Sequence, residues 1–200
     1  MKLLLITSAL AGSFAFLPVG TAPSVLPQDP QQIAEMMKKA EKFTKPGTHH
    51  ELLKRFLGKW NTETHFVMGG QKTPAEKGQC EWTWLVEGRW LKSTMTGTMM
   101  GQPLSSYGWL GYDNLKQSYV DTRVSSMDTA MNHSEGDLTP DGKALITYGT
   151  LDEYLTGEHD KMVRYVWRFV SADEMLLEVH DLPIGEENTQ VIAIRYQRAK

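Results

Sequence analysis

Cysteine is nearly absent from this sequence, since only Cys80 occurs among 200 residues. One cysteine excludes an internal disulfide and a cysteine-based zinc site. Neither sign of charge is in large excess: 21 basic and 24 acidic residues give a formal net charge of −3, so nucleic acid is not an expected partner. Glycine (17 residues) and methionine (11 residues) are abundant, in a chain with the 40% hydrophobic content of an ordinary globular protein.

Long apolar runs are also lacking, and the one at the N-terminus is too short for a membrane span. Residues 3–17 are uncharged but fall short of the about 20 residues that a span requires. Lys2 precedes this run, and Gly20-Thr21-Ala22 supplies the small residues of a cleavage site. We therefore expect residues 1–22 to be a signal peptide for export to the periplasm or the extracellular space, with no transmembrane span after cleavage. An uncleaved anchor is the alternative.

The single thiol, Cys80, lies in a segment where it alternates with Trp82 and Trp84. This pattern favours burial of Cys80 as a small hydrophobic residue. In a compartment that permits disulfides, the alternative is a reactive or intermolecular thiol.

Residues 23–47 are predicted to form a linker and an amphipathic helix. Asp29-Pro30 is a helix start, with an N-cap acceptor before proline at the first helical position. Helical spacing then continues until Lys45-Pro46-Gly47 stops it. The apolar residues at this spacing are Ile33, Met36, Met37, Ala40 and Phe43. We expect a helix over 30–43 whose apolar face either packs on the following domain or binds a partner.

A second, shorter helix is predicted from Thr48, which has capping-box spacing to Glu51. From Trp60 onward the apolar period changes from helical to two, as in β-strands. Turn-forming residues separate about ten such segments over 59–198, and no helical pattern interrupts them, which excludes parallel βαβ units. Residues 48–200 are therefore predicted to be an all-β domain, an antiparallel up-and-down barrel, so that two short helices precede the strands.

Gly58-Lys59-Trp60 lies where the second helix meets the first strand, and it resembles the Gly-x-Trp motif of lipocalins and related calycin barrels. In that family the tryptophan closes the barrel floor, and a basic residue near the last strand packs over its ring. The resemblance implies that Trp60 closes the barrel with Arg195 or Arg198, a contact that cation–π attraction favours.

Further motifs extend the resemblance over residues 48–198. They are His50-x-x-Leu53, Gly88-Arg89-Trp90, Gly97-Thr98-Met99-Met100-Gly101-Gln102-Pro103, Leu110-Gly111-Tyr112-Asp113-Asn114 and Ile194-Arg195-Tyr196-x-Arg198. Together with the Gly-x-Trp motif they resemble the DUF1579 family of secreted bacterial proteins of undetermined function. This resemblance implies a lipocalin-like β-barrel behind a signal peptide, and it implies no catalytic residue.

The predicted function is binding of a small apolar or amphipathic ligand in the barrel. Large aromatic side chains with a few hydroxyl or charged groups suit such a cavity. The residues expected to line it are Trp82, Trp84, Met95, Tyr107, Trp109, Tyr119, Asp121, Arg123, Tyr165 and Trp167. Asp121 and Arg123 share a strand face, so they form either a buried ion pair or a pair on the solvated surface. If the aromatic side chains fill the interior instead, ligand binding is excluded.

Two other classes of function remain open. An enzyme in the same barrel, such as an isomerase, a cyclase or a haem-dependent protein, needs an inward acid–base residue. The candidates are Asp121, Arg123, His65 and His180, of which His180 is predicted to face outward. Methionines 95, 99, 100, 127 and 131 are donors of the kind that copper(I) prefers, but lining an apolar cavity explains them as well. No metal or cofactor is therefore expected. The third possibility is an envelope interaction protein with a filled barrel, and the oligomeric state stays open.

Overall fold

The computed structural model describes residues 29–154, 156–182 and 190–200. The predicted signal peptide, residues 1–22, lies outside these ranges. Helix α1 (Pro30–Thr44) confirms the helix expected over residues 30–43, and the Gln31 N–H donates to Asp29 Oδ1 at 3.0 Å. The chain divides into two units between Lys39 and Ala40. Within the described ranges, no helix combines the length and the apolar content needed to cross a membrane.

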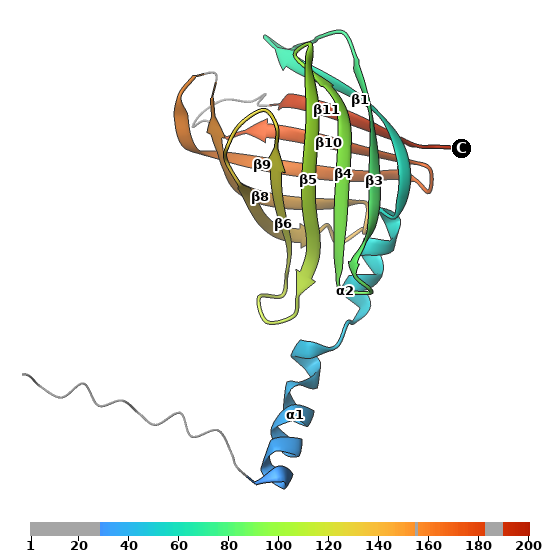
Figure 1. Ribbon diagram of the computed structural model, residues 1–200, viewed down its shortest axis with the longest axis vertical. Coiled ribbons are helices and arrows are strands. Elements are labelled where there is room, and N and C mark those ends of the chain that lie inside the picture. Colours follow the sequence, from blue (N-terminus) through green and yellow to red (C-terminus); the bar gives the residue numbers. More distant parts are fainter. Residues whose placement is uncertain (1–28, 155, 183–189) are drawn as a thin grey trace, which may run out of the picture. The chain divides into compact units, whose positions relative to one another are not determined.

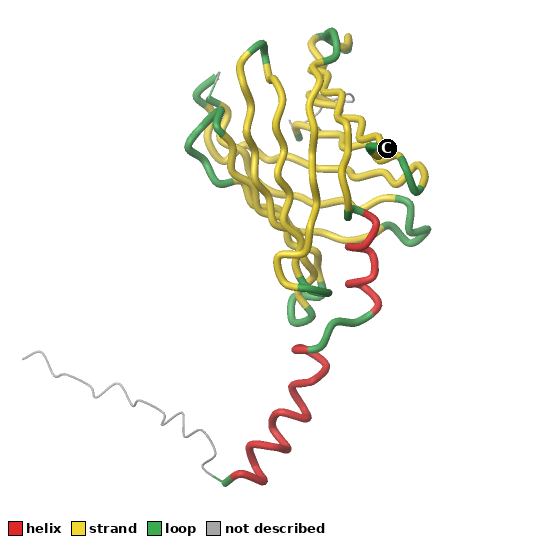
Figure 2. Tube along the Cα trace, turned by 45° about the vertical axis from the view of Figure 1, so that its right-hand side comes forward, coloured by secondary structure: helices red, strands yellow, loops and turns green. Residues whose placement is uncertain are grey.

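The unit from Ala40 to Lys200 is built around one antiparallel sheet that closes on itself (Figure 1, Figure 2). The strands found in the described ranges are β1 (Gly58–Met68), β2 (Gln71–Lys72), β3 (Glu76–Val86), β4 (Trp90–Met99), β5 (Gln102–Asp113), β6 (Ser118–Ser125), β7 (Asn132–Leu138), β8 (Ala144–Glu153), β9 (Glu158–Ser171), β10 (Glu174–Asp181) and β11 (Gln190–Arg198).

Closure of the sheet follows from the order in which these strands pair. Strands β3 to β11 pair in chain order, β1 pairs with β3, and β11 pairs back with β1. Strand β2 only extends β1 as a short hairpin, so ten strands form the wall. The predicted all-β, antiparallel up-and-down barrel is confirmed.

Side chains alternate between the inner and outer faces of the wall, as a period of two predicts. In β10, Met175, Leu177 and Val179 are buried, and the residues between them are more exposed. In β1, Thr62 and Thr64 are buried in the same manner. The interior is therefore assembled from alternate residues of successive strands.

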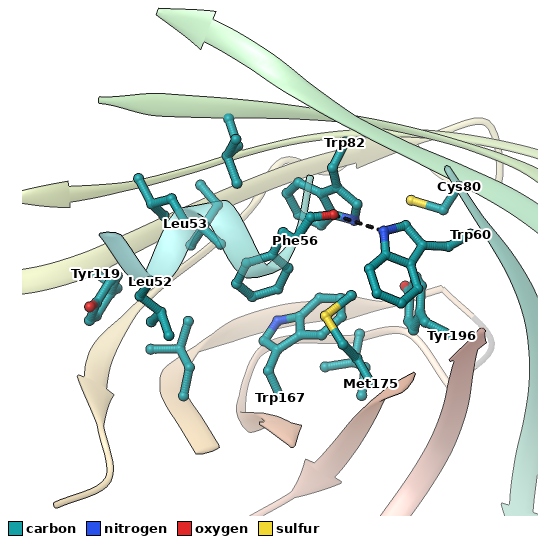
Figure 3. Close-up of a cluster of buried hydrophobic side chains, with 14 of the residues drawn as sticks. Leu52, Leu53, Phe56, Trp60, Cys80, Trp82, Tyr119, Trp167, Met175 and Tyr196 are labelled. Carbon is teal, nitrogen blue, oxygen red and sulfur yellow. Dashed lines mark hydrogen bonds between the residues drawn. The ribbon is translucent and has the colours of Figure 1, made fainter. Parts of the chain in front are cut away.

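The helical segment before β1 enters one end of the barrel and fills it. Helix α2 (Thr48–Glu51) is followed by the 3₁₀ helix η1 (Leu52–Arg55) and then by Phe56. Phe56 is fully buried, and its ring centroid lies 5.1 Å from that of Trp82 and 5.2 Å from that of Trp167 (Figure 3). Aromatic contacts of this kind add to the hydrophobic gain of burial. We call this set the plug: Leu52, Leu53, Phe56, Trp82 and Trp167.

The start of α2 differs from the predicted capping box. The N-cap residue is Gly47, whose N–H donates to Nδ1 of His50 at 3.0 Å. The prediction that Thr48 and Glu51 cap each other is therefore wrong, and Glu51 lies within 2.6 Å of the Lys54 ammonium instead. Because His50 is buried, this cap ties the start of the helix to the interior of the domain.

Arg198 covers the ring of Trp60 at the plugged end. Its Cζ lies 4.2 Å from the ring centroid, and its Nη1 donates to the Leu57 carbonyl at 2.8 Å. Gly58 has a φ of +112°, and a Cβ at this position would lie 2.7 Å from Arg198 Nη1. The Gly-x-Trp motif therefore needs its glycine both for the backbone angle and for the approach of the arginine.

Of the two arginines predicted to cover Trp60, only Arg198 does so. Arg195 lies on the other face of β11, between the buried Ile194 and Tyr196, and its Nε donates to Glu174 Oε1 at 2.8 Å. The prediction for Arg195 is thus corrected by strand alternation.

Replacing Arg198 tests this closure. We expect Arg198→Met to lower the free energy of unfolding by about 1–3 kcal/mol, because it removes a cation–π contact and hydrogen bonds to the carbonyls of Leu57 and Ala172. Arg195→Met is the matched control and should cost less than about 1 kcal/mol, since it breaks only an exposed ion pair. Urea unfolding measures both variants, and equal losses would contradict a closing role for Arg198.

Candidate functional site

The half of the barrel that the plug does not reach contains a cavity of about 340 Å³. Strand β1 starts beside the plug at Gly58, and its far end, from Phe66 to Met68, lines this cavity. The rest of the wall comes from strands β4 to β11 and from the loops at the open end. Its chief apolar members are Met95, Leu104, Leu177, Val179, Ile192 and Ile194. The interior is therefore packed at one end and hollow at the other.

Methionine is prominent in the wall of the cavity. The methionines that line it are Met68, Met95, Met99, Met100 and Met127. Met131, grouped with them on sequence grounds, is 68% exposed and does not line the cavity. No cluster of three or more His, Cys, Asp or Glu side chains placed to hold a metal occurs in the described part of the chain. The thioethers give the wall a soft, adaptable apolar surface.

Asp121 and Arg123 form an ion pair on the inner side of β6. Arg123 Nε donates to Asp121 Oδ1 at 2.8 Å, and Nη2 donates to Oδ2 at 2.7 Å. The Asp121 side chain is 6% exposed and that of Arg123 is 21% exposed, and Arg123 also lines the cavity. Of the two alternatives left open by the sequence, the internal pair is therefore confirmed. We call it the inner ion pair.

The inner ion pair lies between the plug and the cavity. The Arg123 Cζ is 5.2 Å from the ring centroid of Trp167 and 6.0 Å from that of Trp82, both members of the plug. Guanidinium groups are attracted to aromatic faces at such distances. Arg123 is thus held by a carboxylate and two indole rings, so the floor of the cavity is a fixed polar group.

Two tyrosines near Arg123, Tyr165 and Tyr196, also belong to the polar part of the wall. Burial raises the pKa of Tyr165 to about 12 and raises the pKa of Tyr196 even further. For Arg123, burial by itself favours a lower pKa, but the charge and the hydrogen bonds of Asp121 raise the pKa above its ordinary value. At neutral pH these two hydroxyl groups are therefore neutral, and the Arg123 guanidinium is charged.

The residues predicted to line a ligand site are divided among several environments. Met95, Arg123 and Tyr165 line the cavity. Trp82 and Trp167 are buried in the plug, and Trp84 packs partly buried against the same core. The remaining inward members, Tyr119 and Asp121, are buried in the barrel without lining the cavity.

Tyr107 and Trp109 were predicted to face the interior, and the structure places them on the outer face of β5. Tyr107 is 45% exposed. Between Leu104 and Leu110 the buried residues have the opposite parity. In this part of the strand the larger side chains thus lie outside and the smaller ones inside, which leaves room in the barrel.

Several wall residues were missed, although their strands had been recognised. Phe66, Leu177, Val179, Ile192, Ile194 and Tyr196 line the cavity. Their alternation in β1, β10 and β11 was the signal that could have identified them.

The two histidines considered for an enzyme or a haem protein do not reach the cavity. Nδ1 of His65 lies 2.7 Å from the Thr73 carbonyl, at the base of the β1–β2 hairpin. His180 has the parity opposite to the buried Val179, and its Nε2 is 3.6 Å from Glu178 Oε2. Within the described ranges the cavity wall includes no histidine. The inward acid–base candidates are thus Asp121 and Arg123, which are bonded to each other.

With this geometry established, comparison with known proteins identifies the family. The family model described as "Protein of unknown function (DUF1579)" matches residues 45–198. The chain belongs to the DUF1579 family. The suspected resemblance is therefore confirmed over the barrel and the plug. No curated protein matches the chain.

Two solved structures share the fold of this DUF1579 protein at low sequence identity. Rv2717c from M. tuberculosis is 13% identical, with a TM-score of 0.57 over 78% of this chain and 100% of that one. The S-type phycobiliprotein lyase CPES from Guillardia theta is 11% identical, with a TM-score of 0.52 over 81% of this chain and 97% of that one. At these identities the similarity establishes the fold alone.

The environment of Cys80 predicts an unreactive thiol. Cys80 is 3% exposed, and burial raises its pKa to about 12. Because the thiolate is the nucleophile, we expect no labelling of native protein by iodoacetamide at about pH 8, where an ordinary thiol with a pKa near 8.5 reacts. Full labelling should appear once urea unfolds the chain. Rapid labelling of native protein, followed by mass spectrometry, would show instead that the thiol is accessible.

Proposed function

We propose that the protein binds a small apolar or amphipathic molecule in the cavity. The observation that carries this proposal is the cavity itself, about 340 Å³ of space behind mainly apolar walls in the half of the barrel that the plug leaves open. Small-molecule sites typically measure about 300–1,000 Å³ and combine apolar walls with a few polar groups. Arg123, Tyr165 and Tyr196 supply such polar groups here.

The composition of the wall and the fold both support binding. Methionine side chains adapt their shape to an occupant more readily than branched residues do, and five of them surround this space. A structural neighbour with the same fold is a phycobiliprotein lyase. The barrel that this protein shares with the lyase is compatible with binding of a small molecule.

Filling the cavity tests the proposal. We expect the neutral fluorescent probe 1-aminoanthracene to bind the wild-type protein with enhanced emission. Ser106→Phe should weaken this binding by about tenfold, because Ser106 lines the cavity and a benzyl group would occupy part of the space. Fluorescence titration measures the affinity.

Ser105→Phe is the matched control for this experiment. Ser105 is the neighbouring residue in β5 and does not line the cavity, so the same substitution should leave the affinity unchanged. Equal weakening in both variants, or no uptake of the probe by the wild type, would contradict the proposal.

We infer that the protein acts after export, in the periplasm or the extracellular space. The support is the sequence of residues 1–22, with Lys2, an uncharged apolar run and small residues up to Ala22. For protein isolated from its own host, intact mass spectrometry should give the mass of a chain that starts at Pro23. Ala22→Phe, which places a large side chain before the cleavage point, should retain the leader. A native mass that includes residues 1–22 would overturn the inference.

A further inference from the structure

The inner ion pair determines which charge a cavity occupant can carry. Arg123 is the only cationic side chain among the described residues of the cavity wall. It contacts Asp121 through two hydrogen bonds, and Asp121 is almost fully buried. The pair is therefore neutral as a unit, although Arg123 alone faces the open space.

Arg123 retains donors beyond those that Asp121 uses. A guanidinium has five N–H groups, and Asp121 accepts one from Nε and one from Nη2. The rings of Trp167 and Trp82 and the carboxylate fix the plane of the group. A carbonyl or hydroxyl oxygen of an occupant can thus accept a hydrogen bond at the floor of the cavity, and no ionic contact has to break.

Placing a carboxylate of an occupant at the same position would have an electrostatic cost. It would either displace Asp121, which leaves that buried carboxylate without its cation, or add a second negative charge beside it. Both arrangements are costly in a low-dielectric interior, where an unpaired charge is poorly solvated. An uncharged acceptor carries neither cost.

Acidic side chains at the open end act in the same direction. The Tyr119 hydroxyl donates to the His49 carbonyl at the plugged end of β6, so the loop after β6, which carries Asp128, lies at the opposite end. Asp128 and Asp152 both line the cavity. Asp128 accepts a hydrogen bond from the Ala130 N–H in its own loop, and Asp152 of β8 accepts one from the Asp160 N–H of the adjacent strand β9. Within the described ranges neither has an ion-pair partner. Their negative potential repels an approaching anion.

Resting on the binding function proposed above, we infer that the cavity selects uncharged amphiphiles, whose polar oxygen contacts Arg123, and rejects carboxylates of the same length. The selectivity comes from Asp121, which already neutralises Arg123, the one cation that the described part of the wall contains, and is strengthened by Asp128 and Asp152 at the opening.

Competition between matched ligands tests this inference. The assay measures how well each of three ligands displaces 1-aminoanthracene from the protein: decanol, methyl decanoate and decanoate. It is done at about pH 8, where a carboxylic acid is ionised. We expect decanol and the ester to bind at least about tenfold more tightly than decanoate. Asp121→Asn keeps the shape of the side chain but removes its charge, so decanoate should gain about tenfold relative to decanol in this variant.

Glu81→Gln is the control for the loss of one negative charge. Glu81 is exposed on the outer side of β3, so its replacement should leave the ligand ranking unchanged. If Asp121→Asn does not fold, the double variant Asp128→Asn/Asp152→Asn should still raise the relative affinity for decanoate, more so at low salt than at high salt.

Two results would overturn the inference, and they are distinguishable from each other. The probe could bind while wild-type protein prefers decanoate, or while neither Asp121→Asn nor the double variant changes the ligand ranking. In either case the inferred charge selectivity is wrong, and the proposed binding function is still supported. If no probe or ligand binds at all, the proposed function fails, and the selectivity fails with it.

Discussion

Burial of Phe56 between Trp82 and Trp167 is the contact on which the rest of the molecule depends. Inward side chains can just fill a barrel of about eight strands, and this one has ten. The helical segment before β1 supplies the missing volume at one end only. The position of this segment therefore produces a packed core at one end, in a chain whose single thiol rules out an internal disulfide. It also leaves the other half of the barrel open, so that a small molecule can fit there.

Trp82 and Trp167 also connect the core to the cavity. Each packs against Phe56, and each presents its ring to the guanidinium of Arg123. The polar floor of the cavity thus rests on fully buried residues of the core. A charged group inside a barrel is expensive to bury, and here its position is fixed by a carboxylate and two aromatic faces rather than by solvent.

Much of the fold was predictable because alternation is a local property of the chain. The strands, their antiparallel order and the helix at α1 follow from apolar period and turn residues. Alternation shows which residues share a face but not which face is inside. In β5, the large Tyr107 and Trp109 suggested an inward face, yet Leu104 and Gly108 occupy it, because the neighbouring strands and the plug determine how much volume remains. The choice between Arg195 and Arg198 likewise required the register of β11 against β1.

The seam between β1 and β11 gives the domain a demanding folding route. Leu57 and Arg198, joined by a hydrogen bond across the closed end, are 141 residues apart in sequence. The barrel cannot close until the last strand exists, and this one distant pairing requires a long stretch of chain to be closed into a loop first, which costs entropy and slows folding. Until that strand arrives, β1 presents an unpaired edge and the aromatic interior faces water. The segment that fills the barrel thus precedes in sequence the wall that surrounds it, and the two indole rings that cover Phe56 come from β3 and β9, later in the chain.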